Sequence, residues 1–116
     1  MKSTAGYILN EQALAVLSDI ATEAHVQIQR NFKEINPVIG VSRSMRAQGI
    51  PADAMTIDCL KTGKRIILIL HDDNPEVVLY QFSFKAKDPS DEFLKIQLNE
   101  LTVQKLYEWV QSYFTK

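Results

Sequence analysis

The sequence predicts an α+β domain in which an N-terminal helix, a four-stranded antiparallel meander sheet and a C-terminal helix form two layers. Apolar residues recur at helical spacing over residues 10–35 and again over residues 100–114. Between them, four short runs with strand patterning are separated by turn signals. The 116 residues, 46% of them hydrophobic, suffice for a single domain (1–116) with its own core. Both helices are expected on one face of the sheet.

Residues 10–35 are predicted to form one long amphipathic helix. Asn10 is a suitable N-cap, and Asn36-Pro37 ends the helix because the residue before a proline avoids the helical conformation. The apolar positions are Ala13, Leu14, Leu17, Ile20, Ala21, Ala24, Ile28, Phe32 and Ile35. Several of them also fit a heptad pattern, so a coiled-coil dimer is the alternative. The wide apolar arc and the small alanines favour a helix that lies on a sheet.

Residues 36–54 interrupt every periodic pattern with two glycines and two prolines. They are predicted to form a long irregular connection with one short helical turn around residues 42–48, and loops of this length are usually functional or mobile. Arg43 and Arg46 are three residues apart, so a helical turn would place them on one side. Such a pair can bind a carboxylate or a phosphate, which makes it a candidate anion site; the alternative is a solvated loop.

The four strands are predicted over residues 55–60, 65–70, 77–84 and 93–98. Gly63 suits a tight hairpin, and HDDNPE (71–76) supplies the next turn. Folding the chain at these turns places Ile57 opposite Leu68, and Leu68 opposite Tyr80. One face then collects Met55, Ile57, Cys59, Ile66, Leu68, Leu70, Val78, Tyr80, Phe82 and Phe84, and Leu94, Ile96 and Leu98 can join it. The two helices are expected to cover this face.

The second face of the sheet has an apolar centre formed by Ile67, Ile69, Val77 and Leu79. An apolar patch of this kind must be covered, or it promotes association. Residues 36–54 are one possible cover, and a second copy of the protein is the other. We favour the second, and therefore expect a homodimer that associates through this face.

The sheet is predicted to be polarised, with Lys61, Lys64, Lys85 and Lys87 at one end. Asp53, Asp72, Asp73 and Glu76 fall at the other end. The lysines are a candidate contact for an anion or nucleic acid, although polar hairpin ends are common and the net charge is only −1. The stretch YQFSFKAK (80–87) has the aromatics of an RNA-stacking strand. Because those aromatics align with the apolar positions of neighbouring strands, burial is the better interpretation.

No motif specifies a chemistry. His71, Asp72 and Asp73 are consecutive, so their side chains diverge, and we expect no metal or other cofactor. Cys59, the single cysteine, falls on the predicted core face, where a thiol is inert, and one cysteine suits a reducing cytoplasm. We expect a non-catalytic cytoplasmic protein that binds an unidentified protein partner. The alternative is an accessory protein that binds anions or nucleic acid through the arginines and lysines above.

Overall fold

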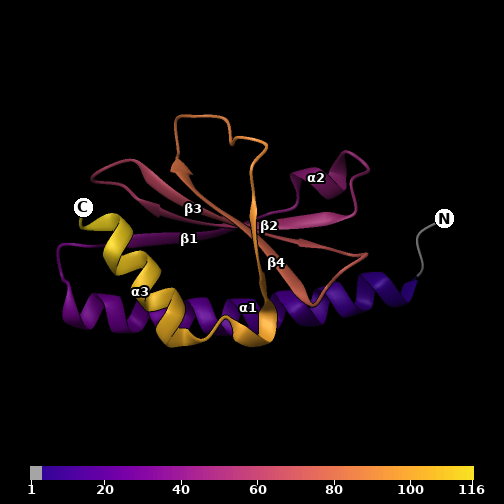
Figure 1. Ribbon diagram of the computed structural model, residues 1–116, viewed down its shortest axis with the longest axis horizontal. Helices are drawn as coiled ribbons and strands as arrows, with labels where there is room; N and C mark the ends of the chain where they lie inside the picture. The colour runs from indigo at the N-terminus through magenta and orange to yellow at the C-terminus, as the bar shows by residue number, and fades with distance from the viewer. Residues whose placement is uncertain (1–3) are drawn as a thin grey trace.

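The computed structural model describes residues 4–116 and has the predicted α+β architecture with one additional strand (Figure 1). In chain order the elements are α1 (Thr4–Asn31), β1 (Pro37–Ser42), α2 (Ser44–Ala47), β2 (Ala52–Cys59), β3 (Lys64–His71), β4 (Val77–Phe84), β5 (Leu94–Gln97), a 3₁₀ turn (Leu98–Glu100) and α3 (Val103–Phe114). The strands form one antiparallel sheet in the order β1-β2-β3-β4-β5. The sheet is therefore a meander of five strands.

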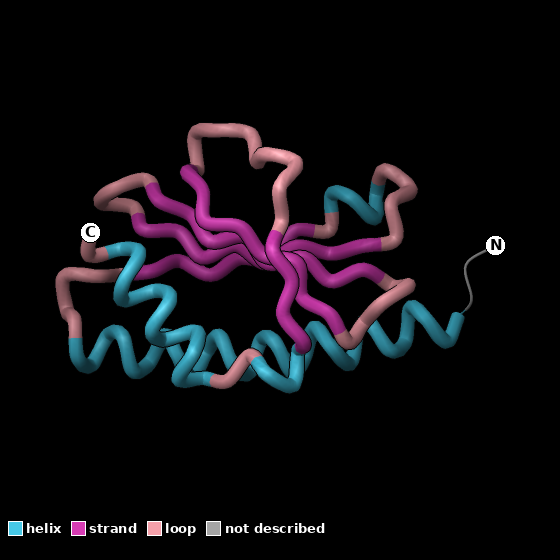
Figure 2. Tube along the Cα trace, viewed as in Figure 1, coloured by secondary structure: helices cyan, strands magenta, loops and turns pink. Residues whose placement is uncertain are grey.

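Both long helices lie on the same side of the sheet. Figures 1 and 2 show α1 and α3 below the strands, whereas α2 and the loop of residues 85–93 rise above them. The helices pack against each other and against the sheet in a single core. Its fully covered members include Leu17 and Ile28 of α1, Ile66 and Leu68 of β3, and Leu106 of α3. The predicted packing of the first helix on a sheet is confirmed.

The first helix begins earlier and ends earlier than predicted, at Thr4 and Asn31 rather than at residues 10 and 35. Asn10 is therefore not the N-cap. It lies inside α1 with no exposed surface, and its Nδ2 donates to Asp53 Oδ2 at 3.2 Å. The predicted 36–54 segment is also more ordered than an irregular connection, because it contains both β1 and α2.

Strand β1 was missed because Pro37 and Gly40 are unfavourable in strands. Pro37 is the first residue of an edge strand, where the lost backbone N–H is tolerated. The β-branched residues Val38, Ile39 and Val41 supply the strand propensity. The predicted helical turn is confirmed as α2. Residues 36–54 therefore extend the sheet by one strand, so most of them cannot cover its second face.

The strand register agrees with prediction in one hairpin and is shifted in the other. In the β3–β4 pair, Leu70 lies opposite Val78 and Leu68 opposite Tyr80, as predicted. In the β2–β3 pair, Ile57 lies opposite Ile66 rather than Leu68. The shift is two residues, so every side chain keeps its predicted face. Gly63, at φ 76°, closes a turn that begins after Cys59, and its N–H donates to the Cys59 carbonyl at 2.8 Å.

The last helix begins at Val103 rather than at residue 100, because residues 98–100 form the 3₁₀ turn. Thr102 is its N-cap, and its Oγ1 accepts a hydrogen bond from Lys105 N at 3.0 Å. At the other end, Tyr113 Oη donates to the Ser83 carbonyl at 2.6 Å. Burial raises the pKa of Tyr113, which keeps this donor protonated. The helix is thus anchored to β4.

In the part of the chain that the structure describes, no helix combines the length and the apolar character needed to cross a membrane.

Candidate functional site

The four predicted residues of the second sheet face lie together in the structure. Ile69 pairs with Leu79 across β3 and β4, and Ile67 and Val77 are two residues away on the same strands. Ile67 is only 7% exposed, and the other three are half-buried. The patch is therefore apolar but only partly accessible to solvent. It lies on the side of the sheet opposite to α1 and α3.

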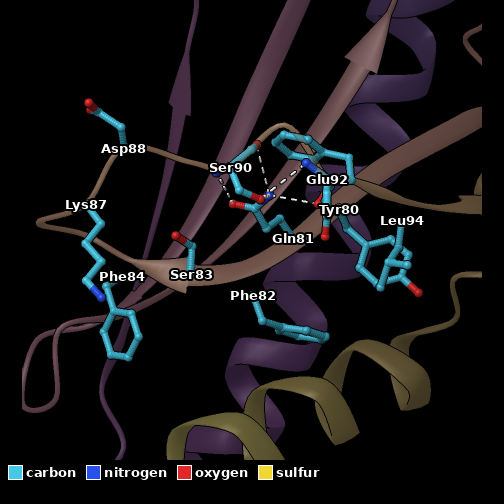
Figure 3. A pocket seen from close by; sticks show the side chains of 11 residues that line it. Tyr80, Gln81, Phe82, Ser83, Phe84, Lys87, Asp88, Ser90, Glu92 and Leu94 are labelled. Carbon is cyan, nitrogen blue, oxygen red and sulfur yellow. Dashed lines mark hydrogen bonds between the residues drawn. The ribbon is translucent and has the colours of Figure 1, made fainter.

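Polar contacts border this patch where the loop of residues 85–93 folds over β4. The Gln81 amide nitrogen donates to Ser90 Oγ and to the Glu92 carbonyl, each at 2.9 Å, and its oxygen accepts from Ser90 N at 3.1 Å (Figure 3). Further along the face, Arg65 binds Asp58 with two hydrogen bonds of 2.6 and 2.9 Å. These bonds to Asp58 raise the pKa of Arg65. An apolar centre with a polar rim is the usual anatomy of a protein interface.

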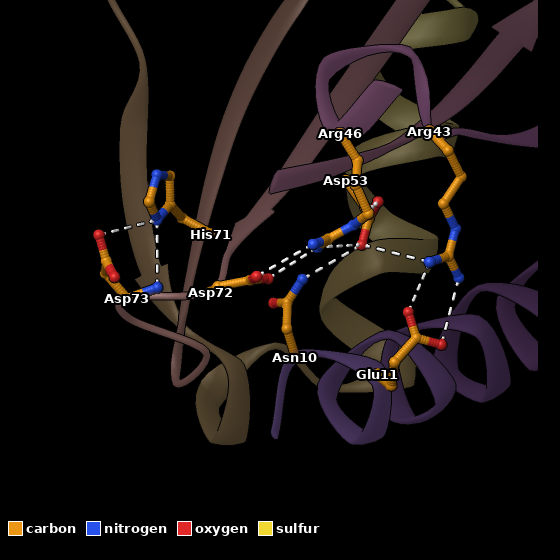
Figure 4. Close-up of polar contacts among 8 residues, drawn as sticks. All are labelled: Asn10, Glu11, Arg43, Arg46, Asp53, His71, Asp72 and Asp73. Atoms are coloured by element: carbon orange, nitrogen blue, oxygen red, sulfur yellow. Dashed lines mark hydrogen bonds and ion pairs between the residues drawn. The ribbon is translucent and has the colours of Figure 1, made fainter. Parts of the chain in front are cut away.

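The two candidate arginines contact carboxylates of their own chain (Figure 4). Arg46 donates to both oxygens of Asp53, at 3.1 and 3.0 Å, and to both oxygens of Asp72, at 2.7 and 3.0 Å. Arg43 donates to both carboxylate oxygens of Glu11 in α1. The hydrogen bonds to Asp72 and Asp53 raise the pKa of Arg46, so its guanidinium remains charged at any ordinary pH.

This arginine–carboxylate cluster joins four parts of the chain: α1, the α2 segment, the start of β2 and the turn after β3. Asp53 is 1% exposed and Asp72 is 3% exposed. Asp72 belongs to the predicted HDDNPE turn, but it is buried because Arg46 covers it. A phosphate would have to displace two buried carboxylates to reach Arg46 bidentately. The cluster is accordingly built to hold the fold together.

The structure brings together some of the four lysines that were predicted at one end of the sheet. These lysines, called here the lysine rim, are Lys61, Lys64, Lys85 and Lys87. Lys85 N donates to the Gly63 carbonyl at 2.8 Å, so the turn before β3 and the end of β4 do lie side by side. Lys64 Nζ donates to the carbonyls of Tyr113 and Lys116 at the end of α3, where a cation is favourable. Lys87 Nζ lies over the Phe84 ring, 5.2 Å from its centroid. Lys61 and Lys85 are exposed.

The outer edge of β4 is only half covered, which the sequence did not reveal. Strand β5 pairs with β4 from Val77 to Tyr80 and no further. Beside the remaining residues, 81–84, lies a cavity of about 510 Å³. It is lined by Tyr80, Gln81, Phe82, Ser83, Phe84, Lys87, Asp88, Ser90, Glu92, Phe93 and Leu94 (Figure 3).

Aromatic side chains form one wall of this opening. Tyr80 stacks on Trp109 at 4.4 Å, and Phe82 contacts the same indole edge-to-face at 5.7 Å. Phe82 is nevertheless 38% exposed and Phe84 is 39% exposed. Both were predicted to lie on the core face, and they do, but α3 covers only part of this end of the sheet. No local signal marked the opening, because the predicted fourth run, residues 93–98, is as long as the runs 55–60 and 65–70.

The two histidines and the cysteine lie in separate parts of the structure. Cys59 is buried in the core, and His25 Nε2 lies 2.9 Å from the Pro37 carbonyl. His71 Nδ1 accepts a hydrogen bond from Asp73 N at 3.1 Å within its own turn. Within residues 4–116, no three His, Cys, Asp or Glu side chains are grouped so that they could bind a metal ion.

No protein-family model matches the sequence, and the comparisons with curated proteins and with solved structures give no match. The candidate surfaces therefore rest on geometry alone: the second sheet face and the open edge of β4.

Proposed function

We propose that this protein is a non-catalytic protein-interaction module that forms a homodimer through the second face of its sheet. One observation carries the proposal: both long helices lie on the same side, so no long helix covers Ile69, Val77 and Leu79, which are half-buried on the other side. A two-fold dimer uses the same patch on both copies, so an apolar patch can cover itself. The single cysteine, buried in the core, is consistent with a cytoplasmic location.

The size of the sheet face sets what the proposed dimer must bury. The five strands have 4 to 8 residues each, and at about 4.8 Å between strands and about 3.3 Å per residue they present roughly 500 Å² in projection. A standard interface uses about 800 Å² of accessible surface on each partner. The sheet face alone is therefore smaller than a standard interface, and the proposed dimer also needs surface from the flanking 85–93 loop.

The Leu79→Asp variant tests the dimer. A carboxylate in the centre of the patch would lose its hydration in the dimer without gaining a partner, so association should be lost. Light scattering after size exclusion is expected to give twice 13.2 kDa for the wild type and 13.2 kDa for the variant. Val26→Asp is the matched control, because Val26 is 39% exposed on α1 and should leave the dimer intact.

Two outcomes would count against the dimer. One is a wild-type mass of 13.2 kDa at high micromolar concentration. The other is a loss of association in Val26→Asp equal to that in Leu79→Asp. Circular dichroism of both variants checks that they are folded. Ile67 is less suitable for this test, because at 7% exposure a charge there would also damage the monomer.

The alternative function, binding of anions or nucleic acid through Arg43, Arg46 and the lysine rim, has less support. Arg46 is held by Asp53 and Asp72, and Lys64 caps α3. A binding protein of this class depends on cations that are accessible to phosphate. Retention on heparin at low salt that is lost in Arg43→Ala would favour this alternative over the dimer proposal.

A further inference from the structure

We infer that the open half of the β4 edge binds an extended segment of a partner protein, which adds to the sheet as a short antiparallel strand beside residues 81–84. This surface is the edge of β4 rather than the second face, although the two share the 85–93 loop, so the inference goes beyond the proposed dimer. It stands on the backbone geometry of β4, on the side chains around the opening and on the charges at its end.

The backbone of β4 has hydrogen-bonding groups directed at the opening. Lys85 N donates to the Gly63 carbonyl on the β3 side, and Leu98 N donates to the Glu76 carbonyl on the β5 side. Because alternate residues of an antiparallel strand direct their N–H and C=O groups to opposite sides, the even-numbered residues of β4 face β5. Phe82 and Phe84 are the even-numbered residues beyond the end of β5.

Residues 85–93 of the protein do not continue β5 along these backbone groups of β4. The four hydrogen bonds of Gln81 hold Ser90 and Glu92 above the sheet, away from the line in which β5 would continue. The Phe84 carbonyl accepts from Lys87 N at 3.2 Å, but this turn leaves the Phe82 groups facing the opening. An extended chain satisfies groups at this spacing, whereas a helix bonds its own backbone and cannot.

The side chains around the opening define what the added strand must carry. On the helix side it would meet Phe82 and Leu94, which are 38% and 58% exposed, above Trp109. On the other side it would meet the polar loop, including Asp88 and Ser90 (Figure 3). Side chains of a strand alternate between its two faces. The ligand is therefore an apolar–polar–apolar segment.

Charge gives the ligand a direction. Lys85 and Lys87 lie where an antiparallel strand would enter, opposite the end of β4, and Lys61 is in the adjoining turn. An acidic residue just before the first apolar residue would meet these lysines. Glu92, which lines the far end of the cavity, would disfavour an acid there. The expected order of residues in the partner segment, from its N-terminus, is therefore acidic, apolar, polar and apolar.

A second copy of this chain fits the edge less well than a peptide does. Two β4 edges related by a two-fold axis could pair only over residues 81–84, because each strand already pairs with its own β5 from Val77 to Tyr80. Such a pair would gather Lys85 and Lys87 of both copies in one small interface, whereas a free segment can carry acidic residues against these lysines. The occupant is for this reason a flexible or terminal segment of another protein.

The test uses the peptide acetyl-EEITVT-amide with the full-length protein. Trp109 is the only tryptophan and contacts Phe82, so its fluorescence reports binding at this edge. Saturable binding with a dissociation constant below 1 mM is expected, and the amide NMR signals of Phe82 and Phe84 should shift. Methylation of the valine nitrogen, which would face the Phe82 carbonyl, should weaken binding at least tenfold.

Protein variants supply matched controls. Lys85→Glu with Lys87→Glu should weaken binding at least fivefold, whereas Lys105→Glu, on the exposed face of α3, should not change it. Leu79→Asp should bind the peptide as the wild type does, so failure of the dimer and failure of the edge site are distinguishable. No fluorescence change at millimolar peptide would overturn the inference. Equal binding of the methylated peptide, or shifts confined to β1, would overturn it as well.

Discussion

Replacing Arg46 with alanine is expected to lower the free energy of unfolding by about 3–5 kcal/mol, because it leaves two buried carboxylates without their shared cation. Asp53 and Asp72 are 1% and 3% exposed, and only Asp53 has a second arginine close by, with Arg43 Nη1 at 3.7 Å from its Oδ2. Small domains are stable by only about 5–15 kcal/mol, so the variant should be partly unfolded at moderate denaturant concentrations. Equilibrium unfolding in urea measures the change.

Two further variants separate this effect from a general loss of charge. Arg43→Ala should cost less than about 1 kcal/mol, because Arg43 and Glu11 form an exposed pair, with side chains 43% and 36% accessible, and the contact of Arg43 with Asp53 is longer, at 3.7 Å. The loss of free energy of unfolding in Arg46→Lys should lie between the losses in Arg43→Ala and Arg46→Ala, since a lysine cannot bind two carboxylates bidentately. If Arg43→Ala and Arg46→Ala cost the same, the cluster does not hold the fold in the way we describe.

Replacing Leu68 with alanine is expected to lower the free energy of unfolding by about 2–5 kcal/mol. Leu68 lies in the central strand with no exposed surface, between Met55 and Tyr80 and beneath the helices. Removing its isobutyl group takes away buried apolar area and leaves a cavity that a packed sheet cannot close. Urea unfolding again measures the difference.

Leu60→Ala is the matched control for this change. Leu60 is 62% exposed in the turn between β2 and β3, so the same substitution there should alter the free energy of unfolding by less than about 0.5 kcal/mol. Similar losses at the two leucines would mean that β3 is not the centre of the core. Such a result would also remove the basis for assigning one face to the helices.

The layered fold could be predicted because periodicity determines which side of each element is apolar. The β3–β4 register was correct, and the two-residue shift between β2 and β3 changed no face, since residues two apart share one. The strand β1 was hidden by Pro37 and Gly40, which are common in loops. An edge strand tolerates both, and Val38, Ile39 and Val41 were the available signal.

The arginine–carboxylate cluster and the open edge could not be predicted from local patterns. Arg46 meets Asp72 across 26 residues of sequence, and the pairing of Ala52 with His71 at the end of the β2–β3 hairpin brings them together. The opening beside Phe82 depends on where β5 begins, which is set by the path of the 85–93 loop and its bonds to Gln81. Both features depend on contacts between residues that are far apart in the sequence. The second-face patch, in contrast, follows from the alternation of side chains along single strands.

Isotope-filtered NMR on an equimolar mixture of labelled and unlabelled protein tests the proposed dimer most directly. This measurement detects only contacts between different copies of the chain. We expect intermolecular signals from the methyl groups of Ile69, Val77 and Leu79. Intermolecular signals from Val16 or Val26 of α1 instead, or none at all at millimolar concentration, would contradict the assignment of the second sheet face as the dimer interface.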